Sequence, residues 1–418
     1  MSKIEELIEK LCPNGVEFKK LEEITKSINI GINPRKFFKL NPADSTGFYV
    51  TVRELNGLKG VKEYEKTDKI NDEAIQIINN RANIEKGDIL FSNTGTVGKL
   101  ALVNETPTNW GVNEGIYIIK PIEEKILSKY LYYYLDSSHA YKDYSSKFTG
   151  STLKHVTQKA LASLIVAVPP LEVQCEIVHI LDDFTELSAE LSAELEARKR
   201  QYCYYREKLF EFNNDGELKT MGELFPFIRN GFVGTIRPFF TDEKNGIRYL
   251  EGTNIHNGII SDNEMIYVTK EFHQRHKKNE LKEDDILMVQ SGHIGECAVV
   301  GKKYKGANCH ALIIMSNGGK CLSKYIVHYF HTLKGLKALN PAITGGTIKH
   351  VLAGKIGKIK VPCPPIEEQT KIVNILDKLE KLCNDISEGL PAEIEARQKQ
   401  YEYYRDKLLT FKELKVNE

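Results

Sequence analysis

The sequence predicts an α+β protein: two mixed, strand-rich globular domains separated by a long antiparallel two-helix coiled coil, with a pseudo-twofold internal repeat. Three observations lead to this class. The 418 residues contain one architecture twice. Each copy changes from short β-branched and aromatic runs, bounded by Gly, Asn and Pro, to a segment of helical pattern. The apolar residues of that segment recur at steps of three and four, as in an amphipathic helix.

The duplication is visible in matching segments. SKYLYYYLDS at 128–137 returns as SKYIVHYFHT at 323–332, and GSTLKHV at 150–156 returns as GGTIKHV at 345–351. EARKRQYCYYREKL at 196–209 returns as EARQKQYEYYRDKL at 395–408. The matching segments follow one another in the same order in both copies, so we predict two domains of one fold.

The repeat and the change of texture set the expected domain boundaries. Residues 1–25 form an N-terminal segment that completes the first repeat. Residues 26–165 form the first strand-rich domain and 166–215 the central helical separator. Residues 216–361 form the second domain and 362–418 the C-terminal helical separator.

The separators are predicted to be long helices. Residues 171–215 contain neither Gly nor Pro, and a helix over most of them runs ~60 Å, longer than a domain of about 140 residues is wide. We therefore expect it to pair with its counterpart in the second copy, and the path of the chain makes the pair antiparallel. Gly389 and Pro391 should kink or break the second helix. The alternative is that each helix packs on its own domain.

Charge divides unevenly although the net charge is +1. Residues 26–159 carry 19 Lys/Arg against 15 Asp/Glu, and residues 220–363 carry 20 against 12. Basic domains suit a polyanion and acidic helices suit protein partners. The alternative is that Glu is abundant in the helices only because it favours helix formation.

Several classes are disfavoured by composition. No apolar stretch approaches the ~20 residues of a membrane-spanning helix, so we expect no membrane association. The start, MSKIEELIEK, lacks the apolar core of a signal peptide, and a cytoplasmic location is expected. None of the eight cysteines forms a CxxC pair, which fits a reduced compartment without a zinc site.

The order of these segments, together with the opening LCPNGVEFKKLEEI, resembles the specificity subunit of Type I restriction-modification systems over essentially the whole chain. The resemblance implies two target-recognition domains, each reading one half of an asymmetric bipartite site in double-stranded DNA. It also implies helical separators, no catalysis and no cofactor in this chain. The implied partners are two modification (methyltransferase) subunits and, for cleavage, restriction subunits.

The tandem SAELSAEL at 188–195 has two interpretations. By composition it is good helix filler. The resemblance instead links such tandem units to the length of the unread spacer. Four residues add ~6 Å of helix, close to two base-pair steps of ~3.4 Å.

Candidate DNA contacts lie in two kinds of segment, and Arg53 and Asn254, in roughly equivalent positions of YVTVRELNG and YLEGTNIHNG, are added to them. A Gly turn precedes Thr, Lys and His in both copies. Residues shared by two domains that read different sequences favour contact with the DNA backbone, although an ordinary turn explains this segment equally well. Polar residues beside the shared glycines of GTVGK and GHIGE differ between copies, as base readers would, although a simple β-turn is the alternative. The candidates are Arg53, Ser92, Asn93, Thr94, Thr152, Lys154, His155, Asn254, Gln290, Ser291, His293, Thr347, Lys349 and His350.

Tyr and Arg cluster where each helical stripe ends. These residue types are common at interface anchors, so we predict partner docking there; packing of the helix end onto a domain is the alternative. The candidates are Tyr202, Tyr205, Arg206, Tyr401, Tyr404 and Arg405.

No catalytic motif stands out. GTVGK at 95–99 lacks the spacing and the Ser or Thr of a phosphate-binding loop, and NPAD at 41–44 lacks the second Pro and the aromatic of an amino-methyltransferase signature. We therefore expect a non-catalytic recognition subunit. A nuclease with a dispersed site and a coiled-coil protein scaffold are the alternatives.

Overall fold

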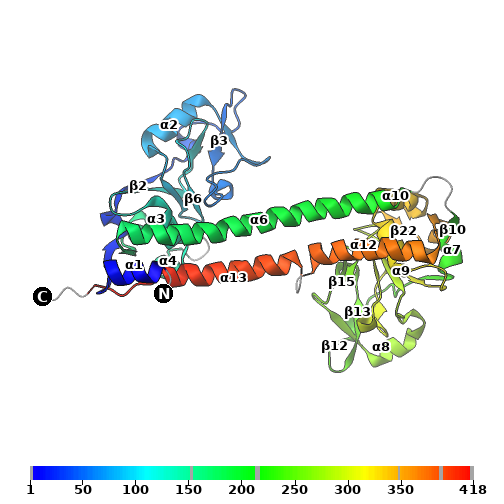
Figure 1. The fold of residues 1–418 in the computed structure, drawn as a ribbon. Helices are drawn as coiled ribbons and strands as arrows, with labels where there is room; N and C mark the ends of the chain where they lie inside the picture. Colours follow the sequence, from blue (N-terminus) through cyan, green and yellow to red (C-terminus); the bar gives the residue numbers. More distant parts are fainter. Residues whose placement is uncertain (1–2, 151–153, 212–216, 347–348, 386–388, 415–418) are drawn as a thin grey trace. The chain divides into compact units, whose positions relative to one another are not determined.

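The computed structural model describes residues 3–150, 154–211, 217–346, 349–385 and 389–414. The chain divides into two compact units (Figure 1). The first unit comprises residues 1–191 and 394–418, and the second comprises residues 192–393. Each unit holds one strand-rich domain together with parts of the helical separators.

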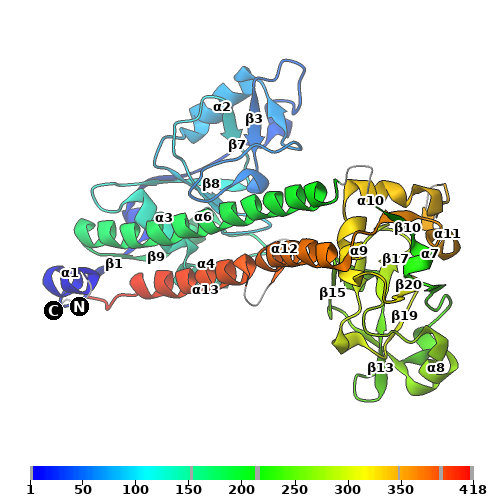
Figure 2. The ribbon, with the colours of Figure 1, turned by 45° about the vertical axis from the view of Figure 1, so that its right-hand side comes forward.

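The first unit is built on a four-stranded antiparallel sheet of order β2-β8-β5-β6. A smaller sheet of order β4-β3-β7 contains a parallel pair, β3 with β7. Helix α2 (Asp72–Ala82), whose N-terminus Asn71 caps, lies beside this smaller sheet in both ribbon views (Figures 1 and 2). The strands are β2 (Thr25–Ile30), β3 (Gly47–Val50), β4 (Lys69–Ile70), β5 (Ile89–Ser92), β6 (Leu100–Leu102), β7 (Trp110–Val112) and β8 (Ile116–Pro121).

The N-terminal segment completes this domain. Strand β1 (Glu17–Lys20) pairs antiparallel with β9 (Ile165–Val168), the strand that leads into the separator. The remaining elements are α1 (Lys3–Leu11), α3 (Ser128–Asp136), α4 (Ser138–Ser146), α5 (Gln158–Ala162) and the short 3-10 helices η1 (Leu21–Glu23), η2 (Pro34–Lys36) and η3 (Val52–Glu54).

The second unit repeats this topology. Its antiparallel sheet has the order β11-β20-β17-β18, and its smaller sheet, β12-β16-β13-β19, again contains a parallel pair, β13 with β19. The strands are β11 (Phe227–Asn230), β12 (Phe240–Thr241), β13 (Gly246–Leu250), β16 (Ile266–Thr269), β17 (Ile286–Val289), β18 (Cys297–Val299), β19 (Asn308–Cys309) and β20 (Leu312–Ser316). The predicted internal repeat is thereby confirmed.

The connecting elements of the second unit also have counterparts in the first. Strand β10 pairs with β23 as β1 pairs with β9. The strands are β10 (Leu218–Thr220), β14 (Ile255–His256), β15 (Ile259–Ile260), β21 (Ile343–Thr344), β22 (His350–Val351) and β23 (Lys360–Pro362); the helices are α7 (Met221–Leu224), α8 (Lys270–Arg275), α9 (Ser323–Phe330), α10 (Leu333–Ala338) and α11 (Ala353–Ile356). Short 3-10 helices are η4 (Arg237–Phe239), η5 (Gly252–Asn254), η6 (Lys277–Asn279), η7 (Lys302–Tyr304) and η8 (Asn340–Ala342).

The separators are long helices, as predicted. α6 (Leu171–Leu209) is continuous and contributes to both units, whereas the second separator is split into α12 (Ile366–Asn384) and α13 (Leu390–Leu408). α12 ends before Gly389, and Pro391 lies in the first turn of α13, where its missing N–H costs nothing. The predicted break is therefore confirmed.

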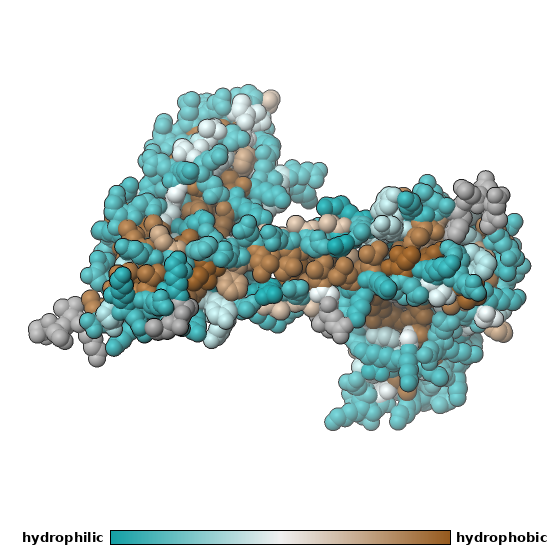
Figure 3. All heavy atoms as spheres, viewed as in Figure 1, coloured by the Kyte–Doolittle hydropathy of each residue, from teal (hydrophilic) through white to brown (hydrophobic). Residues whose placement is uncertain are grey.

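Helix pairing is antiparallel within each unit. In the first unit Phe184 of α6 stacks on Tyr404 of α13, while Leu171 at the start of α6 shares a pocket with Leu414 beyond the end of α13. In the second unit Tyr202 of α6 donates to Glu380 of α12 at 3.3 Å. Apolar residues gather along these helix contacts in the space-filling view (Figure 3). The alternative, in which each separator packs only on its own domain, is therefore wrong within these units.

The repeated PPxxxQ segments have a structural role. Gln174 and Gln369 are completely buried at the starts of α6 and α12. The side chain of Gln174 accepts from Leu127 N at 2.9 Å, and that of Gln369 accepts from Leu322 N at 2.9 Å. Each glutamine thus ties its helix to the loop before α3 or α9, since a buried amide needs such partners.

Candidate nucleic-acid interface

The two kinds of candidate segment come together in the first unit. The turn between β5 and β6 lies against the segment that precedes α5: Thr94 Oγ1 is 3.0 Å from His155 Nδ1, and Gly95 N donates to Lys154 O at 3.1 Å. Residues about sixty positions apart in the sequence thus form one polar surface at the end of the sheet.

The second unit repeats this junction. The turn between β17 and β18 lies against β22, where Val351 N donates to Gln290 O at 2.9 Å and Ser291 pairs with His350. The predicted contacts Thr152 and Thr347 lie outside the described residues. In the sequence the polar turn and the Lys-His segment are far apart and were predicted as two separate kinds of contact. In the structure they form one site in each domain.

Glycine shapes the tip of each turn. Gly95 has a φ of 74° and Gly292 a φ of 83°, a region in which side chains are strained. Among the described residues, apart from each glycine and its two chain neighbours, no heavy atom lies within 4 Å of the position that a Cβ would take at either glycine. Toward the described residues the backbone of both turns is therefore uncrowded, which suits close approach by a phosphate.

Three of the predicted DNA contacts are buried and hold the loops. Ser92 Oγ donates to Thr96 O at 2.6 Å and accepts from Lys99 N at 2.7 Å. Asn93, with 1% of its surface exposed, donates to Glu114 O. Asn254 donates to Ser261 O and Asn263 O. Direct base reading by these side chains stays a prediction that would require the loops to open.

The remaining described candidates reach the surface to different extents. Lys154, Ser291, His293, Lys349 and His350 are exposed, whereas Thr94, His155 and Gln290 are half-buried. The Lys154 ammonium lies 5.8 Å from the centre of the Phe148 ring. These side chains and the turn backbone form the candidate interface of each domain.

Arg53 and Asn254 occupy neighbouring rather than equivalent positions. Asn254 is the third residue of η5, and its side chain accepts from the backbone N–H that precedes this helix. Glu54 does the same as the third residue of η3. Glu54 is therefore the counterpart of Asn254, and Arg53 is the counterpart of Thr253. Glu54 is buried, and although burial opposes ionisation, hydrogen bonds from Thr51, Thr67 and Arg53 hold its pKa below the usual range. Arg53, half exposed, donates to Glu54 at 2.9 Å.

One histidine near the second turn was not singled out by the sequence. The exposed His256, at the end of β14, lies with its ring 6.5 Å from the ring of His293. No motif marks it, because the two residues meet only after the two-stranded sheet of β14 and β15 has folded beside β18 and the turn that precedes it.

A family model described as the Type I restriction modification DNA specificity domain matches residues 13–197 and again residues 213–396. The chain belongs to this family. A Type I restriction enzyme specificity subunit of Escherichia coli is 35% identical over 308 residues, which are 69% of this chain and 72% of that protein. A protein named as a type I restriction enzyme specificity subunit in Haemophilus influenzae is 30% identical over 97% of this chain and 98% of its own length.

A solved structure concerned with assembly and conformational transition of the type I R-M system contains a chain of the same fold. Its TM-score is 0.63 at 16% identity, over 96% of this chain and 98% of that chain. Two copies of the specificity domain, each with strands and paired helices, confirm the predicted fold class.

The predicted partner-binding residues of this specificity protein divide by exposure. Tyr202, Tyr401 and Arg405 are at most 9% exposed and pack within their own units. Tyr205 and Tyr404 remain 38% and 37% exposed, beside the more exposed Tyr204 and Tyr403. The last two were missed as candidates, although they belong to the same repeated YYR segments. Three of the six predicted anchors thus pack inside their units, Arg206 is half-buried, and partner docking stays a prediction for all six.

One group of side chains has the composition of a metal site. Within the described ranges, His328, Asp377 and Glu380 bring ligand atoms within 4.8 Å of one another. The ammonium of Lys324 lies 2.6 Å from Glu380 and 3.8 Å from Asp377, so a cation already balances these carboxylates. In the first unit Lys129 and Tyr133 bind Asp182 in the same way. We interpret both groups as structural links between α3 and α6 and between α9 and α12.

No helix in the described part of the chain combines the length and the apolar character needed to cross a membrane.

Proposed function

We propose that this chain is the DNA-recognition subunit of a Type I restriction-modification complex, in which each strand-rich domain reads one half of an asymmetric bipartite site. The observation that carries the proposal is the polar junction found twice, between the β5–β6 turn and residues 154–155 and between the β17–β18 turn and residues 349–350. The same framework presents different side chains in the two domains.

The two parts of each junction have different roles in this proposal. Lys154 and His155 match Lys349 and His350, and residues shared by domains that read different sequences suit phosphate contacts. The turn tips differ, with Thr94 and Thr96 where the second domain has Ser291 and His293. Base edges in the major groove are distinguished by such donors and acceptors, so the tips suit base reading.

The helical separators set the number of unread base pairs between the half-sites. The chain supplies recognition without catalysis and without a cofactor, and chemistry comes from two modification subunits and from restriction subunits. This role places the chain in the cytoplasm on double-stranded DNA. Because its net charge is only +1, we expect weak DNA affinity for the isolated chain and strong affinity once its partners add positive charge.

The experiment is to co-express the chain with its modification subunit, map methylated sites across the genome, and exchange residues 26–160 for another recognition domain. Only one half of the methylated sequence should change. A change in both halves, or methylation without sequence preference, would refute the assignment of one half-site to each domain. Cleavage or methylation of DNA by the purified chain alone would favour an enzyme, and absence of specific binding in the complex would favour a scaffold.

A further inference from the structure

The ends of α13 and α6 are docked by equivalent contacts in the two units. In the first unit Asp406 of α13 accepts from Ser138 N at 3.1 Å, at the start of α4. In the second unit Glu207 of α6 accepts from Leu333 N at 2.9 Å, at the start of α10. The acceptor residues occupy the same place in the repeated YYRxKL segments, so neighbouring side chains can be compared pair by pair.

In the first unit this end contains an ion pair between a buried arginine and a partly exposed acid. Arg405 Nη1 donates to Asp136 Oδ2 at 2.6 Å, and Nε donates to Asp406 at 3.2 Å. The guanidinium lies over the Tyr401 ring, 5.5 Å from its centre, and the Arg405 side chain is 10% exposed. Two charge-assisted hydrogen bonds thus balance the cation.

The second unit keeps the arginine and loses the acid. Arg206 lies over the Tyr202 ring at 5.1 Å, as Arg405 does over Tyr401, but His331 stands where the first unit has Asp136. Arg206 Nε is buried with no hydrogen-bond partner among the described residues. Burial, reinforced by the neighbouring Arg206 cation, lowers the pKa of His331 to about 3, so the ring is neutral at pH 7.

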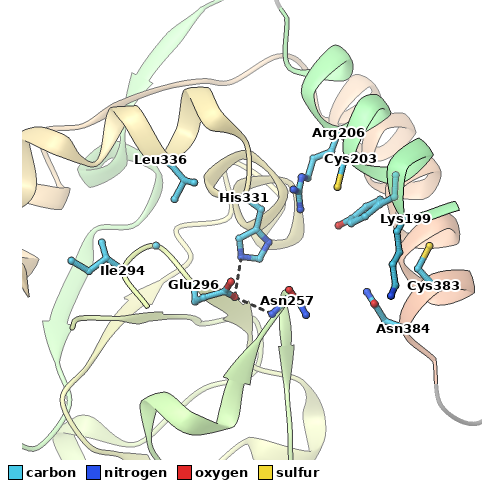
Figure 4. Close-up of a pocket in the computed structure, with 12 residues that line it drawn as sticks. Lys199, Cys203, Arg206, Asn257, Ile294, Glu296, His331, Leu336, Cys383 and Asn384 are labelled. Carbon is cyan, nitrogen blue, oxygen red and sulfur yellow. Dashed lines mark hydrogen bonds and ion pairs between the residues drawn. The ribbon is translucent and has the colours of Figure 1, made fainter. Parts of the chain in front are cut away.

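The region around Arg206 is hollow. A pocket of about 520 Å³ is lined by Arg206 and His331, by Lys199 and Asn384 from the helices, and by Asn257 and Glu296 from the loops (Figure 4). Smaller side chains explain part of this space: Leu336 and Leu339 stand where the first unit has Tyr141 and Tyr144.

The acid in this pocket is already used by other groups. Glu296 Oε2 accepts from Asn257 N at 2.9 Å and lies 3.8 Å from His331 Nε2. Lys199, on the rim, pairs with the exposed Glu196. In the described ranges no Asp or Glu forms an ion pair with Arg206, so its charge lacks the compensation that Arg405 receives.

We propose that this pocket binds a small oxyanion, a carboxylate or phosphate group, which takes on Arg206 the place that the Asp136 carboxylate takes on Arg405. The ligand is monodentate or bidentate to the guanidinium and is within reach of Lys199 at the rim. The site is a property of the second domain alone, and it stands independently of DNA recognition.

The test uses the full-length chain and follows its melting temperature in sodium acetate, sodium phosphate and sodium chloride at matched ionic strength. Acetate or phosphate should raise the melting temperature more than chloride does in the wild type. Arg206→Gln should abolish this difference. His331→Asp supplies the acid within the chain, so it should raise the melting temperature without added anion by about 2–4 °C and remove the anion response.

Two control variants keep the result interpretable. His331→Asn removes the imidazole without adding charge, so it separates loss of the ring from gain of the ion pair and should retain the anion response. Asp136→His removes one of the two acids that pair with Arg405 but leaves Asp406 in place, so it should produce at most a weaker anion response than the second unit shows. An equal response in wild type and Arg206→Gln, or an undiminished response in His331→Asp, would overturn the proposal.

A further measurement distinguishes the two sources of the oxyanion. If an Asp or Glu of a modification subunit occupies the pocket, Arg206→Gln should weaken assembly with that subunit about five- to tenfold, and acetate should compete with assembly. If a free anion occupies it, the assembly constant should be unchanged while the anion response persists. Because anion binding is measured on the chain alone, it can fail without affecting the proposed DNA recognition, and the reverse also holds.

Discussion

The two recognition domains are alike in framework and unlike at the turn tips and beside the arginine at the helix end. In both domains the glycine turn that follows β5 or β17 contacts a Lys-His segment. In both, the helix end that carries the YYR sequence contacts the start of a short helix, α4 or α10. The turn tips differ, and so does the partner of the buried arginine. Comparison of the copies therefore separates residues that build the fold, which are shared, from residues free to acquire a separate specificity.

The largest effect is expected at the turn tips. Thr94→Ser together with Thr96→His gives the first domain the tip residues of the second. Because a good base contact contributes roughly 1–3 kcal/mol of discrimination, methylation of the native site should fall at least about fivefold, with the other half-site unaffected. Methylome sequencing of the co-expressed complex measures this. Thr108→His, on an exposed loop away from the turn, is the matched control; unchanged methylation in the tip variant would exclude base reading there.

Deletion of Ser192–Leu195 from the continuous helix α6 should alter every recognised site without altering either half-site. It removes ~6 Å of helix and slightly more than one turn, so the helical face is nearly retained. We expect the spacer between the half-sites to shorten by one or two base pairs in the methylome. Replacement of Ser192, Glu194 and Leu195 by alanine keeps the length and should keep the spacer. An unchanged spacer after deletion would contradict the link between helix length and spacer length.

The two arginines at the helix ends should differ in stability. Arg405→Gln breaks a pair in which the guanidinium is 10% exposed and the Asp136 side chain 38% exposed. Since the acid is partly solvated, the cost should be about 1–3 kcal/mol, between the values for exposed pairs and for fully buried pairs. Arg206→Gln removes a cation without an acid partner among the described residues and should cost less than about 1 kcal/mol. Thermal unfolding in chloride buffer measures both, and equal losses would show that the ion pair is not the source of the difference.

Acid should destabilise the chain through His331, which faces Arg206, Lys324, His328 and Glu296. Its folded pKa, about 3, lies below the ordinary value of 6.5, so the unfolded chain binds the proton more tightly. The stabilisation is complete above pH 6.5 and is lost as the pH falls towards 3. Between pH 7 and pH 5.5 the loss should be about 1.3 kcal/mol. His331→Asn should flatten the pH dependence of the melting temperature, and a wild-type slope in that variant would disprove the assignment.

The sequence could predict the fold because the internal repeat is visible in the residues themselves, and because Gly and Pro break a helix at the position where they stand. The helix break before Gly389 and the antiparallel pairing follow from the positions of Gly389 and Pro391 and from the direction of the chain. The site was predicted less completely. The contact of Thr94 with His155 depends on tertiary folding, and the burial of Asn93 and Asn254 depends on loops that enclose them. Periodicity identifies which residues face inward along a helix, but it does not distinguish a polar side chain that reads DNA from one that closes a loop.

The smallest effect is expected at the shared lysines. Lys154 and Lys349 are exposed beside the two turns, and contacts to phosphates add affinity without sequence preference. Lys154→Ala or Lys349→Ala in the assembled complex should therefore weaken DNA binding roughly three- to tenfold on every sequence tested and lower the slope of log K against log salt by about 1. Titrations at several salt concentrations give both quantities. Lys66→Ala, an exposed lysine away from the turn, should change neither. If the loss of affinity depended on the base sequence of the probe, the lysines would be readers, and the division between shared positioning residues and divergent reading residues would have to be redrawn.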